Sequence, residues 1–180
     1  QKSGSEEKDL ALAASLAKSS KDLEEHEYAV NSVANALEKF CTSMNVPESP
    51  FVLHLSNVMH LATDVTGVLK DENKKISILD LVSQLHPSAA VCGTPTLKAN
   101  EIIAKLEMMD RGRYAGPVGW LDSKGEGEFG IALRCGQITK NSDQVRLFAG
   151  CGIVAGSNPA TELLESQAKF KPMRTALETL

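Results

Sequence analysis

The sequence predicts an α+β fold with a largely antiparallel sheet and packed helices. Two apolar runs joined by a short polar loop are typical of a β-hairpin, and apolar residues at helical spacing recur at several places along the chain. Strand and helix patterns do not alternate regularly, which argues against parallel β-α-β units. We find no internal repeat, and we expect residues 1–180 to form a single unit.

The expected elements follow one another without long gaps. In chain order they are a frayed start that leads into helix (1–18), a long helix from about Ser19, one bent strand or two strands (51–70), a charged loop (71–75), a short helix (78–85), a helix after Pro95, a hairpin of two strands (114–121 and 129–135), a third strand (145–149) and a last helix that runs toward Leu180.

Each helix is placed by its periodicity and by the residues that begin or end it. The long helix has an apolar stripe that continues to Phe40 and Cys41, and Pro47 ends it because proline lacks the N–H that a helix needs. Ser77 is a suitable cap for the short helix. Asn158, followed by proline at the first helical position, caps the last helix.

The strands are placed by apolar and β-branched runs. Residues 51–70 are rich in Val, Leu and Thr, which favours extended chain. The polar segment 122–128 separates two apolar runs and contains glycine, so it predicts the turn of the hairpin.

Composition narrows the classes of partner. The chain has 19 basic and 23 acidic side chains, a formal net charge of −4 and no basic run, so we expect a small-molecule or protein partner, with no nucleic acid and no membrane. The four cysteines lie far apart without a CxxC pair, as expected of reduced thiols. Because no targeting segment follows Gln1, we expect a cytoplasmic location.

The last helix carries a polar stripe that allows two interpretations. Glu162, Glu165 and Lys169 fall within about 60° of one another around the helix. They form either a solvated glutamate–lysine pair or part of an oxygen-rich site for Mg²⁺, which keeps several waters and takes one or two protein carboxylates. A second carboxylate would have to come from elsewhere, and Glu25 beside His26 is a candidate.

An arginine and two glycines are further candidates for ligand binding. Arg134 lies within a run predicted to be an apolar strand, and it either points to solvent or turns inward to bind a carboxylate with two nitrogens. Gly150 and Gly152 form either a tight connection or a nest of backbone N–H groups for an anion.

The histidines carry weaker signals. His86 is either a polar contact in a cleft or the end of a helix. We interpret His54 and His60 as packing residues on strands.

Several short blocks occur in one order along nearly the whole chain. They are 21–26 (KDLEEH), 58–63 (VMHLAT), 85–87 (LHP), 93–95 (Gly-Thr-Pro), 113–120 (RYAGPVGW), 125–129 (GEGEF), 132–134 (ALR), 149–154 (AGCGIV) and 162–169 (ELLESQAK). This order resembles that of the chorismate-utilising enzymes, the family that includes isochorismate synthase, salicylate synthase and anthranilate synthase component I. The resemblance implies the chorismate-binding enzyme fold.

The resemblance implies a metal site formed by two distant carboxylates. Glu25 and Glu165 match the family's residues that hold Mg²⁺, and only a folded site could join them because they lie near opposite ends of the chain. Gly150 and Gly152 match glycines whose backbone N–H groups face the substrate.

The resemblance also implies a set of side chains that bind chorismate. Tyr114 and Arg134 match the pair that grips the enolpyruvyl carboxylate, and Lys169 matches a lysine that approaches a substrate carboxylate. His86 matches a histidine near the departing ring hydroxyl. Chorismate is a dianion, so a metal cation, an arginine and a lysine form a chemically coherent set.

Within the family, the blocks are most similar to those of isochorismate synthases. The resemblance therefore implies Mg²⁺-dependent conversion of chorismate to isochorismate, with water added at C2 and the C4 hydroxyl lost. The run that anthranilate-type members carry after the glutamate–histidine pair is replaced here by 31–36 (NSVANA), which favours water over ammonia as the nucleophile. The alternatives are salicylate synthase, an aminating enzyme such as anthranilate or aminodeoxychorismate synthase component I, and a non-catalytic fragment.

The blocks match only the C-terminal part of the family's catalytic domain. In the water-adding members, the lysine that activates water and the glutamate that protonates the departing hydroxyl lie upstream of the matched region. We therefore expect the chain to be a fragment. Since general acid–base steps contribute about 10²–10⁴-fold each, we expect this fragment to be inactive or nearly so by itself. We also expect self-association through the surface that the upstream part would cover.

Overall fold

The computed structural model describes residues 2–55, 58–71, 75–140 and 143–178. It confirms the α+β prediction, because helices occur together with strand pairs that are all antiparallel in the described residues. The elements in chain order are α1 (Glu6–Leu16), α2 (Ser20–Glu38), β1 (Cys41–Asn45), β2 (Phe51–His54), β3 (Met59–Ala62), β4 (Thr66–Leu69), α3 (Ile78–Leu85), α4 (Thr96–Leu106), β5 (Pro117–Leu121), β6 (Gly127–Ile131), β7 (Cys135–Ile138), β8 (Val145–Phe148) and α5 (Pro159–Glu178).

The strands of the described residues form four separate two-stranded ribbons. β1 pairs with β4, β2 with β3, β5 with β6 and β7 with β8. The β5–β6 ribbon is the hairpin predicted from the sequence, with Pro117 opposite Ile131 and Leu121 opposite Gly127. Because each strand has one partner within these residues, each leaves its other edge unpaired.

The long helix α2 is shorter than the sequence predicts. It begins after Ser19 as expected but ends at Glu38, well before Pro47. The backbone carbonyl of Phe40 instead accepts a hydrogen bond from Lys70 N at 2.9 Å, and the following residues form β1 against β4. Pairing with a distant strand therefore takes these apolar residues out of the helix, although they continue its periodicity.

The segment around Arg134 also differs from the prediction of one strand over 129–135. β6 ends at Ile131, and Leu133 N donates to the Ile131 carbonyl at 2.8 Å in a tight turn. Arg134 has a left-handed backbone with φ of 49°, and β7, which was not predicted, begins at the next residue. The predicted third strand is β8, which pairs with β7.

The extended segment 51–70 contains three strands, β2, β3 and β4, where one or two were expected. Residues 56–57 of this segment and residues 72–74 of the predicted charged loop lie outside the described residues. The last helix is present as α5, and the predicted end at Leu180 also lies outside them.

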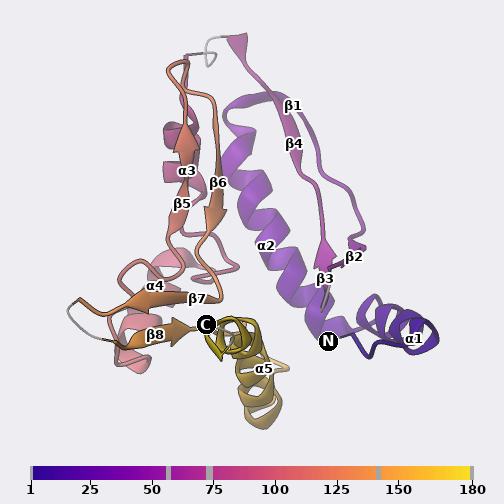
Figure 1. The fold of residues 1–180 in the computed structure, drawn as a ribbon. Helices are drawn as coiled ribbons and strands as arrows, with labels where there is room; N and C mark the ends of the chain where they lie inside the picture. Colours follow the sequence, from indigo (N-terminus) through magenta and orange to yellow (C-terminus); the bar gives the residue numbers. More distant parts are fainter. Residues whose placement is uncertain (1, 56–57, 72–74, 141–142, 179–180) are drawn as a thin grey trace.

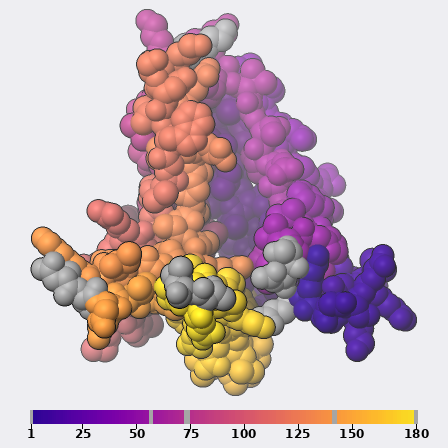
Figure 2. All heavy atoms as spheres, viewed as in Figure 1, coloured from indigo at the N-terminus to yellow at the C-terminus, as the bar shows by residue number. Residues whose placement is uncertain are grey.

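Figure 1 shows two arms that rise from a common base. One arm holds α2 and the β1–β4 ribbon, and the other holds α3 and the β5–β6 hairpin. The arms are joined by contacts between α2 and α3, and the base holds β7, β8, α4 and α5. Figure 2 shows the face on which the arms stand apart, with atoms of α2 visible between them. The core is thin, since the buried apolar residues described are Met59, Ala115 and Phe148.

Candidate functional site

The ammonium group of Lys21 connects the first turn of α2 to the start of α5. The Ser19 hydroxyl begins α2 by accepting a hydrogen bond from Asp22 N at 3.3 Å. Lys21 Nζ then lies 2.6 Å from Glu162 Oε1 and 3.8 Å from Glu165 Oε2. Two helices far apart in the sequence therefore meet at one cluster of charges.

The start of α5 supplies the acidic side of this cluster. Its cap, Asn158, accepts a backbone hydrogen bond at 3.0 Å within the first turn, as the sequence predicts. Glu165 Oε1 lies 2.7 Å from the Nζ of Lys169, one turn further along the helix. Glu162 is only 4% exposed, and although burial acts to raise its pKa, the Lys21 ammonium holds the pKa of this carboxyl below its usual value.

The Glu25 carboxylate reaches the cluster from α2 by passing over Gly152. Burial raises the pKa of Glu25, the nearby Lys21 ammonium opposes this effect, and the Glu165 carboxylate reinforces it. A Cβ atom at Gly152 would overlap the Glu25 carboxylate, so the glycine is needed for this approach. The structure thus brings together Glu25, Glu165 and Gly152, three of the residues predicted from the sequence.

Tyr114 lies against the other predicted glycine. Its ring stacks on Phe148, with ring centroids 5.2 Å apart and an angle of 17° between the planes. A Cβ atom at Gly150 would lie 2.9 Å from the Tyr114 hydroxyl, so the absence of a side chain leaves room for that hydroxyl. Burial raises the pKa of Tyr114, which keeps the hydroxyl protonated and able to donate a hydrogen bond.

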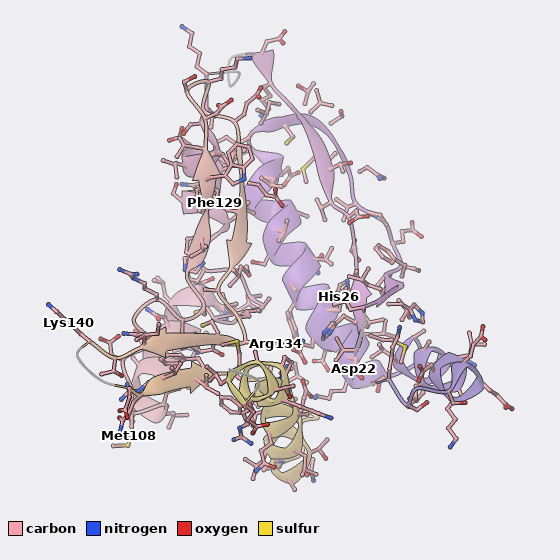
Figure 3. The ribbon with its side chains drawn as sticks, viewed as in Figure 1. Asp22, His26, Met108, Phe129, Arg134 and Lys140 are labelled. Atoms are coloured by element: carbon pink, nitrogen blue, oxygen red, sulfur yellow. The ribbon has the colours of Figure 1, made fainter. Side chains whose placement is uncertain are left out.

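Arg134 turns toward β3 and forms a hydrogen bond with His60. Arg134 Nη2 lies 2.8 Å from His60 Nε2, and since a guanidinium can only donate, the imidazole nitrogen accepts. Burial lowers the pKa of His60, and the charges of Arg134 and Lys169 lower it further, which favours the neutral ring that this hydrogen bond requires. Figure 3 shows Arg134 beside α5 and the start of β7, with Asp22 and His26 at the lower end of α2.

Sequence reasoning missed two contacts, the ion pair of Lys21 with Glu162 and the hydrogen bond of His60 with Arg134. His60 was interpreted as a packing residue, because the short β3 strand gives no sign of a partner more than seventy residues away. The first turn of α2 likewise does not reveal that Lys21 pairs with α5.

His86 lies at the C-terminal end of α3. Its backbone N–H donates to the Val82 carbonyl at 2.9 Å. This hydrogen bond agrees with the interpretation of His86 as the end of a helix. The role near a departing hydroxyl stays a prediction.

The chemistry of the donors fits Mg²⁺. Glu25, Glu162 and Glu165 supply only oxygen atoms, which this ion prefers, and one or two protein carboxylates are enough because water and substrate complete its coordination. In the described part of the chain, no group of three or more His, Cys, Asp or Glu side chains is arranged to hold a metal ion. Lys21 forms ion pairs with both Glu162 and Glu165, and Lys169 forms a second ion pair with Glu165.

Comparison with known proteins places the chain in a family. Residues 1–178 match the family model described as chorismate binding enzyme. The chain belongs to this family. The matched range includes the whole charged cluster, and the family resemblance predicted from short blocks of sequence is confirmed.

The relatives to which the chain is similar include isochorismate synthases. Isochorismate synthase DhbC of Bacillus subtilis is 43% identical over 169 residues, which are 94% of this chain and 42% of that protein. The crystal structure of DhbC from Bacillus anthracis has a TM-score of 0.91 and 44% identity, and the match covers 98% of this chain and 46% of that one. MenF from Escherichia coli, a menaquinone-specific isochorismate synthase, has a TM-score of 0.81 and 33% identity over 96% of this chain and 38% of that one.

The chain spans less than half the length of the curated isochorismate synthases that it matches. None of the helices in the described residues is both long and apolar enough to cross a membrane.

Proposed function

We propose that the chain is the C-terminal part of an isochorismate synthase, which converts chorismate to isochorismate with Mg²⁺. The observation that carries this proposal is the meeting of Glu25 from α2 with Glu165 from α5, beside the hydrogen-bonded pair of Arg134 and His60. Isochorismate synthases that are 41–43% identical over 94–96% of the chain support the choice of reaction within the family.

In this proposal, Glu25 and Glu165 hold the metal and Glu162 supports them. When bound, Mg²⁺ supplies positive charge that neutralises the ring carboxylate of chorismate. The buried Glu162 carboxylate keeps Lys21 at the joint between α2 and α5, and this ion pair fixes the distance between the two helices that carry the ligands. The pKa of Glu25 is raised, so a proton competes with the metal for this carboxylate.

The remaining charges bind the dianionic substrate. Arg134, held by neutral His60, and the protonated hydroxyl of Tyr114 bind the enolpyruvyl carboxylate. Lys169 faces a substrate carboxylate, and the glycines at 150 and 152 allow close approach because they carry no side chain. His86 is proposed to contact the ring near the hydroxyl that leaves C4.

The reaction adds a hydroxyl group from water at C2 and releases the C4 hydroxyl. We assign no residue of this chain to the activation of water or to the protonation of the leaving hydroxyl. The proposed activity therefore belongs to the chain together with the part of the domain that its relatives carry outside the matched region, and we propose that the chain alone is inactive.

The test joins the chain to the part of Bacillus subtilis DhbC that lies outside the match, and measures isochorismate formed from chorismate with Mg²⁺. We expect activity that Glu165→Gln lowers by at least about 10²-fold, because a metal ligand is lost. Glu101→Gln on α4, an exposed position, is the matched control and should leave activity unchanged. A joined protein that is folded but never forms isochorismate would refute the proposal.

A second candidate is an aminating or salicylate-forming reaction on the same substrate. Anthranilate synthase component 1 of Saccharolobus solfataricus is 39% identical over 174 residues. This similarity supports an aminating reaction as the alternative. Chromatography of the products formed with and without ammonium separates the candidates. Anthranilate, aminodeoxychorismate or salicylate as the main product would replace our assignment.

A further inference from the structure

The guanidinium group of Arg111 connects the two segments that flank α4. Its Nε and Nη2 atoms donate to the two carboxylate oxygens of Glu107 at 2.8 and 2.5 Å, and its Nη1 atom donates to the Val91 carbonyl at 2.8 Å. Glu107 caps the end of α4, whereas Val91 lies between α3 and α4. Two parallel hydrogen bonds to one carboxylate fix the orientation of a guanidinium. The end of the Arg111 side chain is therefore held in one place.

The same guanidinium lies over the ring of Tyr114. Its central carbon is 5.6 Å from the ring centroid, within the range of a cation–π contact. The backbone favours this contact, because Tyr114 N donates to the Arg111 carbonyl at 2.8 Å in a tight turn. Both the main chain and the side chain of Arg111 thus contact Tyr114, whose ring also stacks on Phe148.

These contacts are more than an ion pair that supports a helix. Oppositely charged residues four apart often stabilise a helix end, and Arg111 with Glu107 has this spacing. However, the contacts of Arg111 with the Val91 carbonyl and with the Tyr114 ring both reach beyond α4. The two charged side chains are 27% and 30% exposed, far less than those of the surface pair on the same helix.

We propose that Arg111 is a positioning residue, which holds the hydroxyl of Tyr114 where it binds a substrate carboxylate. This inference rests on the proposed function, in which Tyr114 binds the enolpyruvyl carboxylate. The place of the hydroxyl is narrow, since a Cβ atom at residue 150 would lie 2.9 Å from it. Because the ring carries the hydroxyl, a ring that moves takes the hydroxyl out of this place. Arg111 acts through Tyr114 and does not itself contact the substrate.

The charge of Arg111 also acts on the Tyr114 hydroxyl. Burial raises the pKa of Tyr114, and the Arg111 guanidinium lowers it. The other titratable groups that face this hydroxyl raise its pKa, and they are Glu107, Cys135 and Cys151. Loss of the guanidinium should therefore raise the pKa of Tyr114 further.

NMR of the chain alone tests the proposal without substrate or metal. The chain has two tyrosines, so isotope-labelled tyrosine gives two sets of ring signals, and Tyr114→Phe identifies one of them. We expect Arg111→Met to move the Tyr114 signals and to raise the pKa at which they titrate, while the signals of Tyr28 stay in place. Arg113→Met is the matched control, because it removes the same charge from an exposed position in the same turn. Tyr114 signals that Arg111→Met leaves unchanged, or that both variants change equally, would overturn the proposal.

A second variant decides the matter if Arg111→Met does not fold. Arg111→Lys keeps the positive charge, but an ammonium has no planar fork that can hold the Glu107 carboxylate and the Val91 carbonyl together. The Tyr114 ring signals should therefore still move in this variant. Signals that stay in place in folded Arg111→Lys would contradict positioning by the guanidinium.

Kinetics of the joined protein separate positioning from a purely structural role. Arg111→Met should raise KM for chorismate by at least about fivefold and change kcat by less than about threefold, because this carboxylate is bound alike before and during the reaction. In the Tyr114→Phe background the same substitution should leave KM nearly unchanged, since no hydroxyl is left to position. An equal rise of KM in both backgrounds would contradict action through Tyr114. A joined protein that forms no isochorismate would instead refute the proposed function, and NMR would still decide whether Arg111 holds Tyr114.

Discussion

At the base of the molecule, α2 and α5 bury a carboxylate against an ammonium group, whereas the β5–β6 arm leaves apolar side chains in solvent. Glu162 is 4% exposed while Trp120 is 59% exposed. Hydropathy alone would predict the opposite, with the tryptophan buried and the glutamate in solvent. Burying a charge is costly, so it persists where its partner is held in place. The comparison shows that the base holds a buried ion pair, whereas the arm leaves apolar side chains exposed to solvent.

The largest expected effect is at the buried carboxylate. Glu162→Ala leaves the Lys21 ammonium without its closest anion and should lower the free energy of unfolding by about 2–3 kcal/mol. Urea unfolding followed by circular dichroism measures the change. If the loss is below about 0.5 kcal/mol, the base is not held together by this pair and the contrast with the arm fails.

Gly152→Ala should have the next largest effect. The added Cβ would overlap the Glu25 carboxylate, so the loss of stability should be about 1–3 kcal/mol, with Glu25 displaced from the cluster. Gly156→Ala is the matched control, because a Cβ there would meet no atom within 4 Å. Equal unfolding midpoints for the two variants would show that Glu25 does not lie over residue 152.

The third effect is a dependence of stability on pH. In the folded chain the pKa of His60 lies below its ordinary value of about 6.5. The neutral His60 ring therefore contributes to stability above that pH, and this contribution is lost as the pH falls through the folded pKa. His60→Gln keeps an acceptor for Arg134 without titrating. We expect the variant to lose less stability than the natural chain between pH 7.5 and 5.5. His54→Gln, at an exposed position on β2, should behave as the natural chain does.

The smallest effect is at an exposed ion pair. Lys98 Nζ lies 3.2 Å from Glu101 Oε2, and both side chains are about 70% exposed. Lys98→Ala should change the free energy of unfolding by less than about 0.5 kcal/mol, since solvent screens such pairs. A change as large as that of Glu162→Ala would mean that burial does not determine how much the ion pairs at the base stabilise the chain.

The sequence predicted the elements whose signals are local. Ser77 and Asn158 begin helices where expected, and the glycine-containing turn gives the hairpin. β1 and β7 were missed because each depends on pairing with a strand elsewhere: the helical stripe continues to Cys41, and the left-handed residue Arg134 lies within an apolar run.

Part of the site was predicted because charged residues at fixed spacing leave a visible pattern. The spacing on the last helix singled out Glu162, Glu165 and Lys169, and the family resemblance selected Glu25 and Glu165 as metal ligands. The structure brings these side chains to one cluster. His60 was interpreted as a packing residue, since its hydrogen bond to Arg134 is set by the fold alone. Lys21 pairs with a helix at the other end of the chain, a contact that no local rule supplies.

The most direct test of the proposed site is the position of a bound divalent cation. Crystals of the chain joined to the remainder of the domain are soaked with Mn²⁺, whose anomalous scattering locates the ion. We predict one ion coordinated by the carboxylates of both Glu25 and Glu165. An ion bound elsewhere, or bound by only one of these two carboxylates with the other turned away, would contradict the account.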